Sequence, residues 1–193
     1  MNKIAYEDIR DIAAYEKIRP EFRRRIIAVK ASRRMPVGDR MTLLFENRDT
    51  VLFQIQEMMR VERIVHEAAI RHEIDTYNHL VPGELQLCVT MFIDVSEATR
   101  IKEVLDSFVG LPQDCVWIDV DGERVPAVFD LEQSTDTRIS AVQYLTFTFT
   151  SGQARRFMDA SVPAALRVEH PNYRHVVPVD GELRDSLIAD LRV

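Results

Sequence analysis

The hydrophobic pattern of this chain changes period close to residue 82, and this change limits the folds open to it. From Leu85 to Ile93, apolar residues occupy every second position, which is typical of a strand with one face on a core. Before Pro82 the apolar residues recur mainly at helical spacing. Pro82 and Gly83 separate the two patterns, so the sequence predicts an α+β fold with a helical part over residues 1–82 and a sheet part over 83–193, together one compact unit.

The sheet part contains further strand patterns, which predict a mainly antiparallel sheet. Asp121-Gly122 joins two of these patterns and is the strongest hairpin signal in the chain. Helical patterns follow the first strand and the strand that ends near Thr150, and Asp180 begins a last helix. The resulting order is close to a split βαβ (ferredoxin-like) arrangement with one extra strand, and we expect helices to cover one face.

The N-terminal part is predicted to contain a short helix from Asp8 to Ala14, two longer helices, and an edge strand at Arg40 to Phe45. Pro20 suits the first turn of a helix that runs to about Arg34, because its missing N–H leaves no hydrogen bond unmade there. A longer helix is predicted from about Thr50 to Asn78, packed on the sheet.

The predicted long helix carries a candidate metal site. At 100° per residue, Glu62, His66 and Glu73 fall on one stripe among apolar residues, away from the charged face. Carboxylate and imidazole groups of this kind can supply part of a site for iron, manganese or zinc. The set is incomplete, so further ligands would have to come from another helix, from a second copy of the chain in a homo-oligomer, or from His72 or His79 nearby.

A structural interpretation of the same residues is favoured. Carboxylates in an apolar stripe need compensation, because an unpaired buried charge costs several kcal/mol or more. Arginines of the preceding helix could neutralise Glu62 and Glu73, with His66 a hydrogen-bonded core residue.

The segment from Lys17 to Arg34 holds eight cations against the single Glu21. Such a run could bind anions or nucleic acid, with Arg23, Arg24, Arg33 and Arg34 as the contacting residues. The net charge of the whole chain is −6, which makes nucleic acid the less favoured partner. Arg33 lies on the helical face of the apolar Phe22, so we expect its side chain to be buried and paired with a carboxylate.

No complete catalytic or cofactor motif occurs, since GxGxxG, GxxxxGK[ST], HExxH and GxSxG are all absent. The N-terminal segment has no hydrophobic region of a secretory signal, and no apolar stretch is long enough to cross a bilayer. Cys88 and Cys115 each lie in an apolar stretch, as reduced thiols do. We therefore expect a cytoplasmic protein without a membrane partner.

The segment from Arg19 to Pro82 contains the elements RPEFR, FENRDT and HEIDTYN, and ISAVQYLTFTF follows later. With these elements the chain resembles a bacterial protein family of unknown function whose members are typically encoded beside rubrerythrin-like proteins and an iron–sulfur oxidoreductase. The resemblance implies a link to oxidative stress or non-haem iron chemistry and names these two proteins as candidate partners. It implies no catalytic residue.

These observations favour an accessory or binding protein of a rubrerythrin-associated redox system over an enzyme. The first alternative is a metal- or haem-binding redox protein centred on Glu62, His66 and Glu73. The second is an anion or nucleic-acid binder that uses the basic helix.

Overall fold

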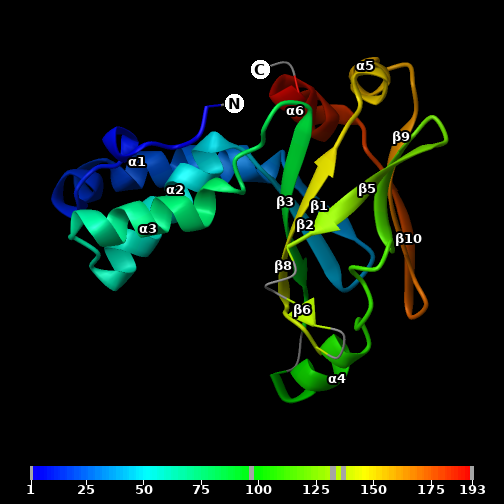
Figure 1. Ribbon diagram of the computed structural model, residues 1–193, viewed down its shortest axis with the longest axis horizontal. Coiled ribbons are helices and arrows are strands. Elements are labelled where there is room, and N and C mark those ends of the chain that lie inside the picture. The colour runs from blue at the N-terminus through cyan, green and yellow to red at the C-terminus, as the bar shows by residue number, and fades with distance from the viewer. Residues whose placement is uncertain (1, 96–97, 131–133, 136–137, 192–193) are drawn as a thin grey trace.

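The computed structural model describes residues 2–95, 98–130, 134–135 and 138–191. Three helices form a layer on one side of the molecule (Figure 1). They are α1 (Ile12–Ala31), α2 (Arg48–Glu62) and α3 (Glu67–Asn78), and a short 3₁₀ turn, η1 (Tyr6–Asp8), precedes them. A sheet with three further helices forms the other side.

Eight strands form a single antiparallel sheet that nearly closes into a barrel. Their spatial order is β1 (Arg34–Val37), β2 (Met41–Glu46), β3 (Gln86–Ile93), β8 (Val142–Thr148), β5 (Glu123–Phe129), β4 (Val116–Val120), β9 (Ala164–His170) and β10 (Tyr173–Pro178). The two outermost strands meet where the hydroxyl of Tyr173 donates to the carbonyl of Val37 and accepts from the N–H of Arg40. Residues 1–82 and 83–193 therefore both contribute strands to the barrel.

Side chains fill the barrel interior. Every strand of the barrel contributes to one core, in which Phe45, Leu43, Val89 and Phe147 are fully buried. Figure 1 shows α4 (Ile101–Asp106) at one end of the barrel, after η2 (Ala98–Arg100), and α5 (Ser151–Met158) and α6 (Gly181–Leu191) at the other end. The two-residue strands β6 (Ser134–Thr135) and β7 (Arg138–Ile139) form a separate two-stranded antiparallel sheet. An eight-stranded barrel has an interior just wide enough for side chains to fill, as they do here.

The predicted split βαβ arrangement is wrong. In a split βαβ unit the two strands joined through a helix are parallel and lie on either side of one intervening strand. Here β3 and β4, which flank α4 in the chain, are separated by both β8 and β5, and the antiparallel pairing across these strands makes them antiparallel to each other. The hairpin of β1 and β2, which comes from the predicted helical part, pairs with β3 and extends the same sheet. Strand β8 lies between β3 and β5, so the sheet curves round instead of forming one layer beneath helices.

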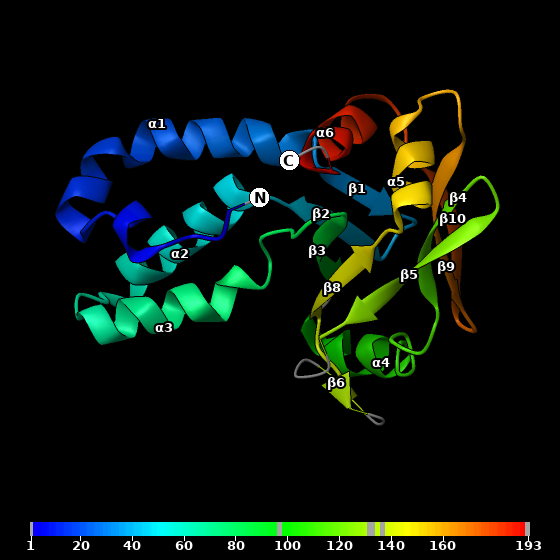
Figure 2. The ribbon, with the colours of Figure 1, turned by 45° about the horizontal axis from the view of Figure 1, so that its top comes forward.

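The single long helix predicted from Thr50 to Asn78 is also wrong. Helix α2 stops at Arg63, whose φ of 55° is left-handed, and the N–H of Ile64 bonds to the carbonyl of Met59 at 2.9 Å. Helix α3 then folds back, as Figure 2 shows. The turn lets Met59 of α2 share a second core with Ile70 of α3, which one straight helix could not do.

Helix α1 is longer at its N-terminus than expected. Asp11 begins it, with a carboxylate that accepts the N–H of Ala14 at 2.8 Å, and Pro20 lies inside the helix and not in its first turn. Tyr15 and Ile26 are the buried residues that anchor α1. In Figure 2, α1 runs along α2 and its C-terminal end reaches α6.

The hairpin prediction at Asp121-Gly122 is confirmed. Strands β4 and β5 pair on either side of these two residues, whose φ angles are 54° and 83°. An Asp-Gly pair favours a type I′ turn, which needs a positive φ at both of its central residues.

Candidate functional site

The three residues of the candidate metal site lie around the break between α2 and α3. Glu62 is the last residue of α2, His66 precedes the first turn of α3, and Glu73 lies in α3 itself. Glu62 and His66 are exposed and Glu73 is half-buried, so the common buried stripe does not exist. In the described part of the chain, no three His, Cys, Asp or Glu side chains are arranged to hold a metal ion. The metal hypothesis stays a prediction, now without the helical geometry that motivated it.

The prediction that arginines of the basic helix pair with Glu62 and Glu73 is wrong, because these arginines pair with other carboxylates. The acidic partners are Glu57 for Arg19, Asp49 for Arg25 and Asp190 for Arg33. Only the first two lie in α2, and the third comes from α6.

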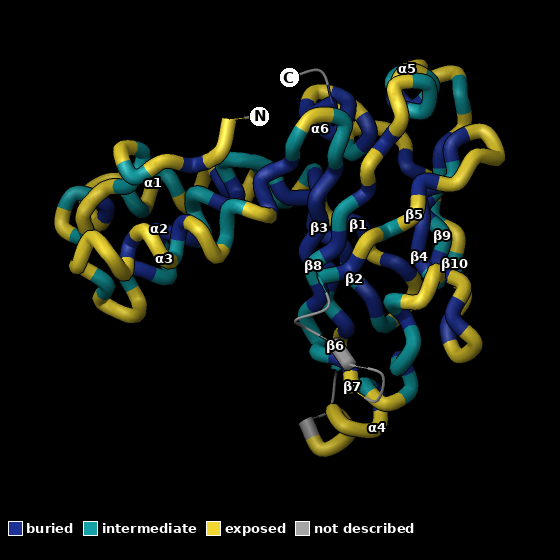
Figure 3. The backbone as a smooth tube through the Cα atoms, viewed as in Figure 1, coloured by how far each residue is buried: buried dark blue, intermediate teal, exposed yellow. Residues whose placement is uncertain are grey.

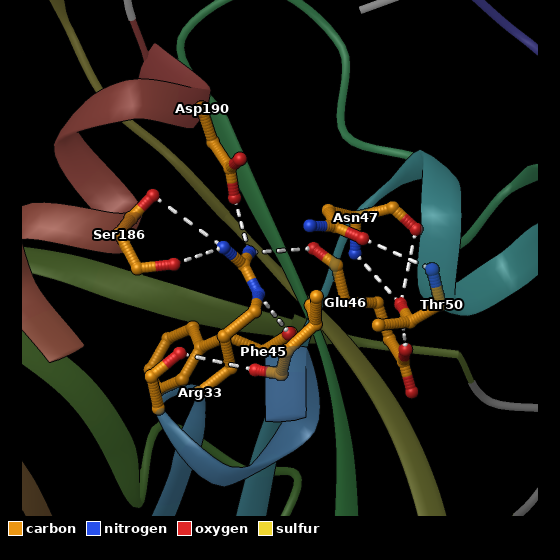
Figure 4. Close-up of polar contacts among 9 residues, drawn as sticks. Arg33, Phe45, Glu46, Asn47, Thr50, Ser186 and Asp190 are labelled. Carbon is orange, nitrogen blue, oxygen red and sulfur yellow. Dashed lines mark hydrogen bonds and ion pairs between the residues drawn. The ribbon is translucent and has the colours of Figure 1, made fainter. Parts of the chain in front are cut away.

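Arg33 is the centre of a buried polar network between α1, β2 and α6 (Figure 4). Arg33 is 1% exposed and its side chain forms an ion pair with Asp190, which confirms that Arg33 is buried and paired. Its Nε donates to the carbonyl of Phe45 at 2.8 Å, one Nη donates to the carbonyl of Glu46 at 3.1 Å, and the other donates to the hydroxyl of Ser186 at 2.6 Å. Because all these donors are used inside the protein, Arg33 is not available to bind an external anion.

A second ion pair joins α1 to α2. The guanidinium of Arg19 donates to both carboxylate oxygens of Glu57 at 2.8 and 2.9 Å, and the hydroxyl of Tyr15 donates to the same carboxylate at 2.7 Å. The hydrogen bonds from Arg19 lower the pKa of Glu57 to about 2, against burial, which raises it, and Tyr15 adds to the lowering.

We expect Glu57→Gln to lower the free energy of unfolding by about 2 kcal/mol at neutral pH, allowing for partial solvent screening. The pKa of Glu57 is lower in the folded chain than its ordinary 4.5, so its contribution is present above about pH 4.5 and is lost as the pH falls toward 2. Urea unfolding of both proteins should show a smaller difference at about pH 3. The control is Glu67→Gln, which removes an exposed ion pair with Arg71 and should change little at either pH. A difference for Glu57→Gln that does not change with pH would contradict the assignment.

The outer face of α1 remains basic and accessible. Lys17, Arg23 and Arg24 are exposed, and Ile27 is 51% exposed. Figure 3 shows exposed stretches, drawn in yellow, along α1. Among the described residues, no carboxylate forms an ion pair with any of the three cations. Arg34, just beyond the helix, is exposed and unpaired within the same set of residues. We call Lys17, Arg23, Arg24 and Ile27 the basic face.

A hollow of about 390 Å³ lies on the adjacent flank of α1, over α2. It is lined by Asp8, Arg10, Ile18, Glu21, Phe22, Arg25, Leu52 and Gln56. Ile18 is 37% exposed, so this flank offers apolar surface next to the basic face.

A smaller cavity of about 220 Å³ lies where the helical layer meets the outer surface of the barrel. It is lined by Lys30, Leu44, Glu46, Val51, Gln54, Tyr77, Leu80, Thr90, Phe92, Val142 and Tyr144. Glu46 is the buried carboxylate of this set, at 7% exposure. The cavity could not be predicted from the sequence, because its lining residues are far apart in the chain. They come from α1, α2, α3 and the segment after α3, and from strands β2, β3 and β8. The available signal was Glu46, a carboxylate at the end of the apolar segment RMTLLF.

The two cysteines are free thiols. Burial raises the pKa of Cys88, and burial together with Asp114 raises the pKa of Cys115. Neither environment activates a thiolate. In the described residues, no helix has the length and apolar composition that a membrane span requires.

Comparison with known proteins places the chain in a family. Residues 3–191 match the family described as "Protein of unknown function (DUF3501)". A crystal structure of a novel protein of unknown function from Burkholderia pseudomallei K96243 is similar over 98% of this chain and 100% of that chain, with 31% sequence identity and a TM-score of 0.91. No curated protein matches the chain. The family match spans nearly all of the sequence, and the chain therefore belongs to the DUF3501 family of proteins of unknown function.

Proposed function

We propose that this protein is an accessory binding protein, and that the basic face of α1 docks onto an acidic surface of a partner protein. The observation that carries the proposal is the set of exposed cations at Lys17, Arg23 and Arg24, without internal ion pairs, in a chain whose net charge is −6. Complementary charge across an interface speeds association and excludes wrong partners.

The composition of the surface supports a protein partner over nucleic acid. Ile27 follows Arg23 by four positions and so lies on the same side of the helix, where a protein partner could bury it. Arginine beside exposed apolar surface is typical of protein interfaces. Nucleic-acid binding depends mainly on many phosphate contacts, and internal ion pairs already occupy Arg19, Arg25 and Arg33.

The candidate partners are the rubrerythrin-like protein and the iron–sulfur oxidoreductase that the family resemblance implies. We place the interaction in the cytoplasm, in a system that responds to oxidative stress. The free thiols of Cys88 and Cys115 are compatible with a reducing compartment.

The test is the affinity of the purified protein for each of these two partners, measured by biolayer interferometry across a range of salt concentrations. We expect one partner to bind, with an affinity that falls as salt rises. The double variant Arg23→Glu/Arg24→Glu should weaken binding by about ten-fold or more, because each reversal replaces attraction with repulsion.

The matched control is Arg155→Glu/Arg174→Glu, which makes the same charge change at exposed positions away from α1. It should leave the affinity within about two-fold of the parent. Failure of both partners to bind, or equal weakening by the two double variants, would overturn the proposal. Tight binding of duplex DNA with a steep salt dependence would favour the nucleic-acid alternative instead.

A further inference from the structure

We propose that the 220 Å³ cavity between the helical layer and the barrel binds a small organic zwitterion, whose protonated amine contacts Glu46 and whose anionic group contacts Lys30. This site is separate from the basic face, and neither proposal depends on the other.

The cavity has the composition of a ligand site. Its walls are mostly apolar or aromatic, from Leu44, Val51, Leu80, Phe92, Val142 and the rings of Tyr77 and Tyr144. A small number of polar groups point into such a site and orient the ligand. Sites for drug-sized ligands usually exceed about 300 Å³, so this cavity suits a smaller molecule.

The buried carboxylate of Glu46 has two hydroxyl partners and no ion pair among the described residues. Oε1 accepts the hydroxyl of Thr90 at 2.7 Å and Oε2 accepts the hydroxyl of Thr50. Arg33 contacts the backbone carbonyl of Glu46, whereas the carboxylate points the other way, toward Thr50 (Figure 4). Within the described residues no Lys, Arg or His lies within ion-pair distance of it.

A buried carboxylate with neutral donors alone is poorly compensated, because two hydroxyls do not replace a counter-ion. Each carboxylate oxygen can accept a further hydrogen bond beyond the one it already receives. An ammonium group in the cavity would supply both the missing donors and the missing charge.

The aromatic lining fits the same cation. Tyr77 and Tyr144 line the cavity on either side of the junction, one from α3 and one from β8. Burial raises the pKa of both phenols, which therefore stay neutral. Neutral tyrosine rings attract ammonium groups through their faces.

Lys30 explains why a simple amine is not the best ligand. Its side chain also lines the cavity, and its Nζ lies 5.8 Å from the centre of the Phe53 ring. In the described part of the chain no carboxylate pairs with Lys30, so apart from the cation–π contact with Phe53 its ammonium has no counter-ion there. A cavity with one free cation and one uncompensated carboxylate is complementary to a molecule that carries both charges.

Isothermal titration calorimetry of the full chain tests the proposal with β-alanine, γ-aminobutyrate and δ-aminovalerate as probes. They differ only in the distance between amine and carboxylate, so we expect one of them to bind best. Butylamine and butyrate each lack one charged group of γ-aminobutyrate and should bind about ten-fold more weakly or worse than the best probe. Failure of all three amino acids to bind, or equal binding of the amine or acid alone, would overturn the proposal.

Two variants locate the site. Lys30→Gln should weaken the best probe by about ten-fold without loss of folding, because Lys30 is only half-buried. Glu46→Gln should abolish binding, and its melting temperature shows whether it folds. The matched controls Lys17→Gln and Glu84→Gln alter exposed charges outside the cavity and should bind as the parent does. Unchanged affinity in Lys30→Gln would contradict the assignment even if Glu46→Gln fails to fold.

Discussion

Replacing Arg33 with alanine should lower the free energy of unfolding by about 3 kcal/mol, one of the two largest effects we expect from a single substitution. The variant leaves the buried Asp190 without its counter-ion and removes the donors to the carbonyls of Phe45 and Glu46. Urea unfolding followed by circular dichroism measures the change.

The pH dependence of this loss identifies its cause. Burial raises the pKa of Asp190, and the guanidinium of Arg33 opposes that rise. Without Arg33, the pKa of Asp190 in the folded chain rises further above its value in the unfolded chain. Asp190 is therefore neutral over a wider pH range. A carboxyl group whose pKa is higher in the folded chain stabilises the fold fully only below its pKa in the unfolded chain. This stabilisation is lost as the pH rises through its pKa in the folded chain. The deficit of Arg33→Ala should therefore be largest at neutral pH and smaller near pH 4.

Arg34→Ala is the matched control, because this neighbouring arginine is exposed. It should change stability by less than about 0.5 kcal/mol. If Arg33→Ala unfolds at the same urea concentration as Arg34→Ala, the buried network does not stabilise the fold.

The second large effect is expected at Gly38, where the first and last strands of the barrel meet. Gly38 has a φ of 62°, and a Cβ there would overlap the hydroxyl of Tyr173 and the imidazole of His175. Tyr173 cannot easily move aside, because it is buried and its hydroxyl bonds to Val37. Gly38→Ala should cost about 2–4 kcal/mol from backbone strain and overlap together.

Gly181→Ala separates the two causes. Gly181 has a similar φ of 54°, but nothing lies within 4 Å of the position that its Cβ would take. Thermal unfolding should show only the strain contribution there, about 1 kcal/mol. Equal losses in the two variants would mean that the contact between β1 and β10 is not tight.

Features encoded by neighbouring residues were predictable. Asp121-Gly122 adopts the positive φ angles of its turn, and Leu87 and Val89 face the core as their alternation indicates. Both features depend on backbone preference and side-chain period within a few residues. The burial of Arg33 was also predicted, but from a helical position that it does not have: α1 ends at Ala31, and Arg33 lies in the turn before β1, where partners on β2 and α6 enclose it.

The break of the predicted long helix could not be found locally. Arg63 ends α2 in a left-handed conformation. The sequence does not predict this end, because glycine is the usual residue in that conformation. The two helices gain by packing Ile55 and Met59 against Ile70 and Ile74, and that gain exists only once the chain has folded back. This fold-back also separates Glu62 from Glu73 onto different helices.

The sequence by itself determined the elements whose causes are local: the α+β class, the alternating strands and the hairpin at Asp121-Gly122. Tertiary structure alone decided which distant groups meet. Asp190 lies 157 positions from Arg33, and Thr90 lies 44 positions from Glu46. The physical reason is that helix and strand periods depend on nearby residues, whereas the barrel order, the partner of a buried charge and the lining of a cavity depend on packing between elements far apart in the chain.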